Sequence, residues 1–236
     1  MGPALTLYLV TVLVAAPVVG WRLAASGVLR LTPREVVYRS GMATSWFLAL
    51  AGTAVLWIEQ GPGPAQVGFA SLPVVTGVLW SAGTLAVLLA GMGLFSLLSR
   101  LLGRGESADL VHLIPATRRE RWLFAGLSVT AGITEEFIYR GIALTTLAGW
   151  PWLQPWGGPW PAAAVVAAAF GLGHGYQDGL GMMRAGVLGF LLAIPMLLTG
   201  SLLPGMAAHA ALDLTVLARR PEAHRRKAQE PLREAS

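Results

Sequence analysis

The chain has 236 residues, of which 55% are hydrophobic and only 12% are charged. Soluble globular domains spend about a quarter of their residues on charge, and a soluble chain of this length leaves much of its surface facing water, so the composition argues against a soluble fold. Cysteine is absent, which excludes a disulfide framework, a thiol nucleophile and a cysteine-based zinc site. The sequence therefore predicts an integral membrane protein.

Seven apolar stretches are candidate membrane spans, since a spanning helix needs about 20 apolar residues. They lie near residues 3–24, 40–58, 73–99, 121–148, 160–174, 182–200 and 201–219. The fifth is short, so we expect it to continue into the glycine-rich segment 175–181. Pro195 and Pro204 predict a kink or a tight turn between the last two stretches. The predicted fold class is all-α, a polytopic transmembrane helix bundle of about seven spans that forms a single membrane domain over residues 1–236.

The positive charges predict the orientation of this bundle. Apart from Arg140 and Arg184, the 17 Lys and Arg residues fall in three clusters, which lie at 22–39, 100–121 and 219–233. Positive charge gathers in cytoplasmic loops, so seven spans place the N-terminus outside the cell membrane and the C-terminus inside, with 220–236 as a polar cytoplasmic tail. A nucleic-acid surface would need a continuous basic stripe with interleaved aromatic residues. We therefore expect the lipid bilayer and no nucleic acid as a partner; the oligomeric state stays open.

Three ionisable residues lie inside the apolar stretch 121–148, namely Glu135, Glu136 and Arg140. Each costs roughly 2.5–3.5 kcal/mol at the bilayer centre even on the lenient insertion scale, so these residues need partners and a water-filled cavity. Glu136 and Arg140 are four residues apart on one helical face and are expected to pair. Glu135 lies about 100° further round the helix without an obvious local cation. It is therefore the candidate for general acid–base work.

Two histidines occur in similar apolar surroundings. His174 follows Phe170 by one helical turn, and His209 precedes Asp213 by one turn. A carboxylate one turn from a histidine can hold the imidazole tautomer, as it does for metal-bound histidines. Taken singly, a Glu–Arg pair can simply join helices, a histidine can be a hydrogen-bonded packing residue, and Phe170 can belong to the core. Their occurrence on successive spans favours one shared functional site.

The motifs Glu135-Glu136-x-x-x-Arg140, Phe170-x-x-x-His174 and His209-x-x-x-Asp213 resemble the three signature motifs of the CPBP family in order and helical placement. This family comprises the CAAX prenyl endopeptidases and the bacteriocin-processing or self-immunity proteins. The resemblance covers residues 120–219, the motif-bearing catalytic half. It implies an intramembrane endopeptidase with a site toward the cytoplasmic side. The peptide or protein substrate would be membrane-associated, either CAAX-like or a leader peptide. The catalytic residues that it implies are Glu135, Glu136, Arg140, His174, His209 and Asp213.

The resemblance also implies roles for these residues. Glu135 looks like the base that activates water, with Glu136 and Arg140 as its orienting pair. In a metal-assisted form, Glu135, His174 and His209 hold Zn²⁺ at an open site. In a metal-free form, Glu135 and His174 activate water while His209 and its i+4 neighbour stabilise the oxyanion. In prenyl-processing members that neighbour is commonly Asn, whereas here it is Asp213. An aspartate cannot donate a hydrogen bond unless it is protonated, so Asp213 is expected to orient His209. We favour the metal-assisted form.

Two other functions are compatible with the same composition. A non-catalytic membrane scaffold or immunity protein of the same fold would not need the Glu and His residues, and the intact motifs count against it. A proton-coupled transporter could use Glu and His residues as a relay. Transporters commonly contain internal repeats with paired broken helices, and the sequence shows no such symmetry.

Overall fold

The computed structural model describes residues 1–61 and 67–218 of the chain, and within these ranges it is an all-α membrane bundle. An isolated antiparallel bridge joins Phe69 to Ser201. The predicted cytoplasmic tail, 220–236, lies outside the described residues. The expected fold class is confirmed.

The first half of the chain forms three long apolar helical segments. They are built from α1 (Pro3–Val10), η1 (Thr11–Ala15) and α2 (Ala16–Ala25), then the short α3 (Val28–Leu31) and α4 (Arg34–Gln60), then α5 (Val74–Leu101). The segments Pro3–Ala25, Arg34–Glu59 and Val74–Leu101 are each long and apolar enough to cross a membrane. These segments match the first three predicted spans, and a proline is the N-cap residue of both α4 and α5.

The second half contains shorter and less regular helices. They are α6 (Ala108–His112), α7 (Arg118–Glu135), η3 (Glu136–Leu144), α8 (Thr145–Ala148), η4 (Gln154–Trp156), α9 (Pro159–Gly173), η5 (Gly175–Gln177), α10 (Asp178–Thr199), α11 (Leu203–Leu214) and η6 (Thr215–Ala218). A capping box between Thr117 and Glu120 starts α7, and α7, η3 and α8 follow one another without a break. Together they supply the span predicted at 121–148.

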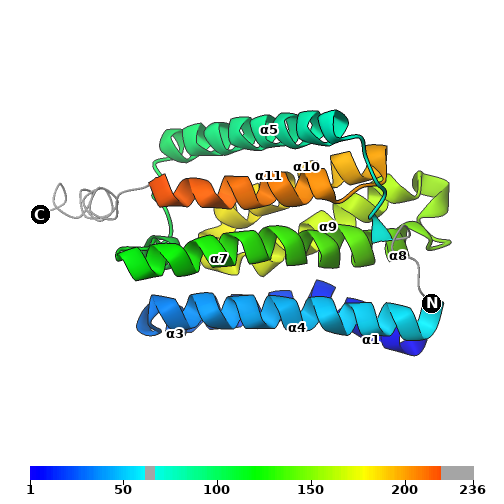
Figure 1. Cartoon of the computed structure of the whole chain (residues 1–236). Helices are drawn as coiled ribbons and strands as arrows, with labels where there is room; N and C mark the ends of the chain where they lie inside the picture. The colour runs from blue at the N-terminus through cyan, green and yellow to red at the C-terminus, as the bar shows by residue number, and fades with distance from the viewer. Residues whose placement is uncertain (62–66, 219–236) are drawn as a thin grey trace, which may run out of the picture.

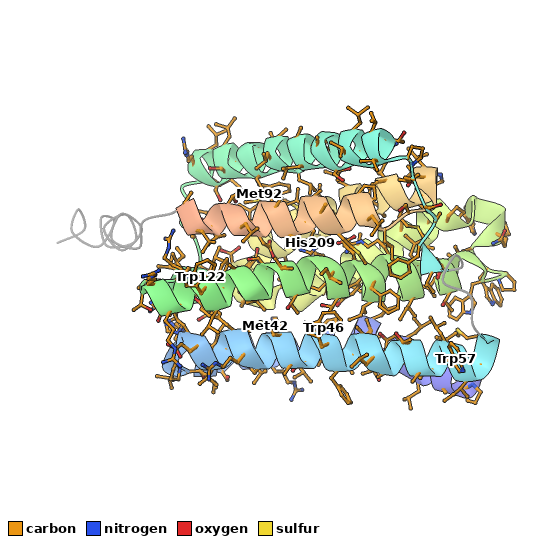
Figure 2. All side chains as sticks on the ribbon, viewed as in Figure 1. Met42, Trp46, Trp57, Met92, Trp122 and His209 are labelled. Atoms are coloured by element: carbon orange, nitrogen blue, oxygen red, sulfur yellow. The ribbon has the colours of Figure 1, made fainter. Side chains whose placement is uncertain are left out.

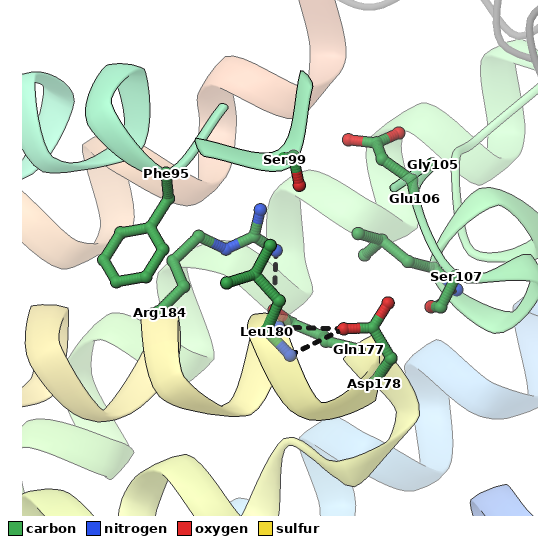
Figure 3. A pocket seen from close by; sticks show the side chains of 11 residues that line it. Phe95, Ser99, Gly105, Glu106, Ser107, Gln177, Asp178, Leu180 and Arg184 are labelled. Atoms are coloured by element: carbon green, nitrogen blue, oxygen red, sulfur yellow. Dashed lines mark hydrogen bonds between the residues drawn. The ribbon is translucent and has the colours of Figure 1, made fainter. Parts of the chain in front are cut away.

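The turn between α9 and α10 corrects one expectation. The stretch 160–174 does not continue into 175–181, because α9 ends at Gly173 and the chain turns through η5. Asp178 has a φ of 65° and a ψ of −177°, a backbone region that residues other than glycine rarely adopt. Its Oδ1 then accepts hydrogen bonds from the backbone N–H groups of Leu180 and Gly181 (Figure 3). A local cap by Asp178 thus starts α10.

Helix α7 lies at the centre of the bundle, between α4 on one side and α11 on the other, with α9 and α10 behind (Figure 1). The approach of α7 to α11 is close at Gly132, where a Cβ would lie 2.7 Å from the backbone N of Ala210. Only a residue without a side chain allows this contact. It brings together the helix that carries Glu136 and the helix that carries His209.

Ion pairs join the first two cationic clusters at one end of the bundle. Arg30 Nε lies 2.9 Å from Asp109 Oδ1, and Arg34 Nη1 lies 3.5 Å from Glu120 Oε1. Figure 1 shows α3 and the start of α7 at this end and the N-terminus and α8 at the other. The two clusters therefore share a side of the bundle, as the alternating topology requires.

Candidate active site

The first motif lies where α7 changes into the π-helical segment η3, which begins at Glu136. Such π-helical turns occur frequently at functional sites. Arg140 Nη1 donates a hydrogen bond to Glu136 Oε1 at 2.9 Å, and both side chains are 1% exposed. The expected Glu136–Arg140 pair is confirmed, and its near-complete burial makes each charge dependent on the other.

The Arg140 guanidinium has two further partners in the protein interior. Its Nη2 donates to the carbonyl oxygen of Gly189 at 2.6 Å, and its Cζ lies 4.7 Å from the centroid of the Phe170 ring. A cation above an aromatic face is attracted by the ring quadrupole. A Cβ at Gly189 would lie 2.9 Å from Phe170 Cδ1 and 3.0 Å from Arg140 Nη2. Because Gly189 has no side chain, both Phe170 and Arg140 fit beside it, and its carbonyl oxygen accepts the hydrogen bond from Arg140.

His209 lies on α11 (Figure 2) and is oriented by Glu136. Its Nδ1 lies 2.9 Å from Glu136 Oε1, and because a carboxylate oxygen only accepts, Nδ1 carries the hydrogen. Asp213 was expected to hold this ring, but its Oδ2 lies 3.8 Å from the other nitrogen, Nε2, which is too long for a hydrogen bond. The buried Glu136–Arg140 pair thus orients His209, whereas the sequence predicted that it orients Glu135.

The Nε2 atom of His209 faces two carboxylates, those of Glu135 and Asp213. Glu135 Oε2 lies 3.9 Å from Nε2, close to the 3.8 Å of Asp213 Oδ2. The side chains of Glu135 and Asp213 are 25% and 38% exposed, whereas His209 is 7% exposed. One nitrogen of the ring is therefore fixed in the interior, and the other points to the accessible side of the site.

His174 lies at the C-terminal end of α9, where the chain turns. Its Nδ1 is 2.8 Å from the carbonyl oxygen of Phe170, so Nδ1 donates and Nε2 keeps its lone pair. The Phe170 ring centroid lies 4.6 Å from that of His174 and 6.1 Å from that of His209. Phe170 is buried and contacts residues from all three motifs. Phe170 therefore belongs to the core, which was one of the two expectations from the sequence, and it also lies at the centre of the site.

Several residues of the site were not singled out by the sequence. Gly189 binds Arg140, and a Cβ at Gly205 would lie 3.3 Å from Glu136 Oε2. Tyr139 packs edge-on against Phe170 at 5.1 Å, and the Tyr176 ring centroid lies 5.7 Å from that of His174. A glycine in a span can signal a close approach. The chain has 29 glycines, so that signal does not separate these two from the others.

The predicted zinc ligands do not form a ready-made metal site. Among the residues that the structure describes, no group of three or more His, Asp or Glu side chains is arranged to hold a metal ion. Glu135 approaches His209, while His174 is bound to the backbone of its own helix. The arrangement gives the metal-assisted form no support, and zinc stays a prediction.

Residues 117–215 match the family model described as Type II CAAX prenyl endopeptidase Rce1-like. This match supports a CAAX/CPBP family assignment for that part of the chain. The match begins at Thr117, the residue that caps α7, and ends at Thr215, immediately after α11. It therefore contains all three motifs, and the family predicted from them is confirmed. No curated protein and no solved structure matches the chain. The Rce1-like family is typically proteolytic.

Proposed function

We propose that this chain is an intramembrane endopeptidase that hydrolyses a peptide bond of a membrane-associated substrate, of the CAAX-like or leader-peptide type. One observation carries the proposal: His209 is held by Glu136 through Nδ1, and its Nε2 faces the partly exposed Glu135 and Asp213. A fixed imidazole beside an accessible carboxylate is the arrangement that general acid–base hydrolysis needs. The CAAX/CPBP membership of residues 117–215 supports it.

In the proposed reaction, Glu135 accepts a proton from a water molecule while the hydroxide attacks the carbonyl carbon of the scissile bond. His174 accepts a hydrogen bond from the same water through the free lone pair on Nε2. The negative charge that develops on the carbonyl oxygen accepts a hydrogen bond from Nε2–H of protonated His209. Glu135 then delivers its proton to the leaving nitrogen as the C–N bond breaks.

The buried groups act on this chemistry by holding His209. A protonated His209 has the carboxylate of Glu136 at one nitrogen and those of Glu135 and Asp213 near the other. Opposite charges at these distances stabilise an imidazolium in a medium of low dielectric constant. Arg140 offsets the charge of Glu136, so the partly exposed carboxylates of Glu135 and Asp213 are the anions that balance the imidazolium.

The test is cleavage of a membrane-anchored reporter peptide by the purified protein in proteoliposomes, with CAAX-like and leader-type anchors compared. Glu135→Gln and His209→Ala are each expected to reduce the cleavage rate by at least about 100-fold, the scale of general acid–base contributions. Glu35→Gln is the matched control, because the described partners of Glu35 are the exposed Arg39 and Arg119 at the end of the bundle. Full activity in both site variants would refute the proposal.

The same variants separate the endopeptidase from the two other functions. A scaffold or immunity protein would keep its cellular phenotype with Glu135→Gln while losing it with a packing change such as Gly132→Val. A transporter would show proton-linked solute uptake into proteoliposomes that Glu135→Gln abolishes, without any cleaved peptide.

A further inference from the structure

A large apolar groove lies between four helices. Its volume is about 1010 Å³, and its walls come from α4, α5, α7 and α11. The lining residues include Trp46 and Leu50 on α4, Val78 on α5, Ile133 on α7 and Ala207 on α11. Leu50 and Val78 are 65% and 60% exposed. In a membrane protein, exposed apolar walls of this size face hydrocarbon or a partner rather than water.

The groove is too short for another membrane-spanning helix. The part of each helix that lines it is at most nine residues long, as in Val129–Phe137, which corresponds to about 12 Å of rise. A spanning helix needs about 30 Å of apolar surface, so the groove covers roughly the depth of one leaflet. It lies toward Val74 and Leu203, where α5 and α11 begin, and away from the cationic end of the bundle.

The lining offers little to a polar peptide. Its hydroxyl groups belong to Thr53, Ser81 and Thr134, and each donates to a backbone carbonyl four residues earlier in its own helix. The remaining polar side-chain group in the lining is the indole of Trp46. A peptide backbone in such a groove would leave buried N–H and C=O groups unpaired, each at a cost of several kcal/mol in lipid. A hydrocarbon chain has no such groups.

We infer that this groove binds the hydrocarbon tails of a bilayer lipid from the leaflet opposite the cationic loops. The groove is distinct from the proposed active site, although both use the same pair of helices. Thr134 and Ala207 line the groove, whereas Glu136 and His209, two residues further along each helix, contact each other. Trp46, which lines the groove, lies on α4, and His209 lies on α11 (Figure 2). Binding of the lipid does not require that the chain cleave peptides.

The experiment is photo-crosslinking in proteoliposomes that contain phosphatidylcholine with a diazirine in its acyl chain, followed by mapping of the adducts by mass spectrometry. Adducts are expected to concentrate on groove residues such as Val78, several-fold above Leu79. Leu79 is the internal reference, because it is 67% exposed on the same helix but does not line the groove. Equal labelling of groove residues and Leu79 would overturn the inference.

Filling the groove provides the second arm. Gly77 lines the groove and a Cβ there would meet nothing within 4 Å, so Gly77→Leu adds a side chain to the groove without a clash at Cβ. Gly83→Leu is the matched control, since Gly83 is equally open on α5 but outside the groove. Groove adducts should fall several-fold in Gly77→Leu and stay unchanged in Gly83→Leu. Undiminished labelling in a Gly77→Leu protein that keeps the thermal stability of the control would contradict a bound tail, and Ala207→Trp repeats the test from α11.

Discussion

The Nδ1 atom of His209 and the Oε1 atom of Glu136 lie 2.9 Å apart, although 73 residues separate them in the sequence. This contact joins α11 to η3 and leaves one nitrogen of the imidazole for chemistry. Arg140 binds the same Oε1 atom at 2.9 Å. One carboxylate oxygen thus fixes a histidine and offsets an arginine, and the predictions below separate these structural contributions from the proposed catalytic one.

The two adjacent glutamates are expected to differ in what they stabilise. Glu136→Gln leaves Arg140 as a buried charge without its counter-ion, so the free energy of unfolding should fall by about 3–5 kcal/mol, along with activity. Glu135 is partly exposed, whereas Glu136 and its partner Arg140 are buried, so Glu135→Gln should abolish cleavage while thermal denaturation stays near wild type. Both are measured in the same detergent by denaturation and by cleavage rate. Equal destabilisation by the two variants would show that Glu135 is structural.

Gly189 is expected to be a positioning residue for the site. Gly189→Ala places a methyl group 2.9 Å from Phe170 Cδ1 and 3.0 Å from Arg140 Nη2, which displaces the arginine and, through Glu136, His209. The turnover number should fall more than the Michaelis constant changes. Gly179→Ala is the matched control on α10, where the Cβ would meet nothing within 4 Å. Unimpaired turnover in Gly189→Ala would rule out this role.

Glu120 gives the bundle a pH dependence at its charged end, before the predicted span begins. Burial raises the pKa of Glu120, but the backbone N–H groups of Thr117 and Ala116 and the guanidinium of Arg34 outweigh it, so its pKa lies below the ordinary value. A lowered folded-state pKa adds stability above the unfolded-state pKa, and this stability is lost as the pH falls through the folded value.

This pH dependence is measured by thermal denaturation of wild type and Glu120→Gln. At neutral pH the variant should be less stable by about 1 kcal/mol, the scale of a helix-capping interaction. The difference should shrink as the buffer is made acidic. A difference that stays constant over the acidic range would mean that the ionised carboxylate does not stabilise the fold.

Metal removal tests the form of the mechanism. The proposed reaction assigns the activation of water to Glu135 and His174 without a metal ion, so extensive dialysis against a membrane-impermeant chelator should leave cleavage unchanged, with less than stoichiometric zinc by elemental analysis. Loss of activity that added Zn²⁺ restores would instead favour the metal-assisted form. A His174→Ala variant that no longer retains zinc would then assign that residue as a ligand.

The sequence by itself determined the membrane character, the helical class and the residues of the three motifs. Burying charge in hydrocarbon is costly, so Glu136 and Arg140 needed a partner, and their four-residue spacing identified it. The first three spans followed from length and apolar composition alone. The turn at His174 did not, because it depends on a short 3₁₀ segment and on the backbone conformation of Asp178.

Only the tertiary structure decided which carboxylate serves which group. The pairing of His209 with Asp213 was the local choice, because both lie on one turn of α11, but Glu136 takes that place from another helix. The reason is the close approach of α7 and α11 at Gly132, together with the space that Gly189 and Gly205 leave because they have no side chain. Helical periodicity describes neighbours within one helix, whereas contacts between helices depend on which small residues face each other after packing.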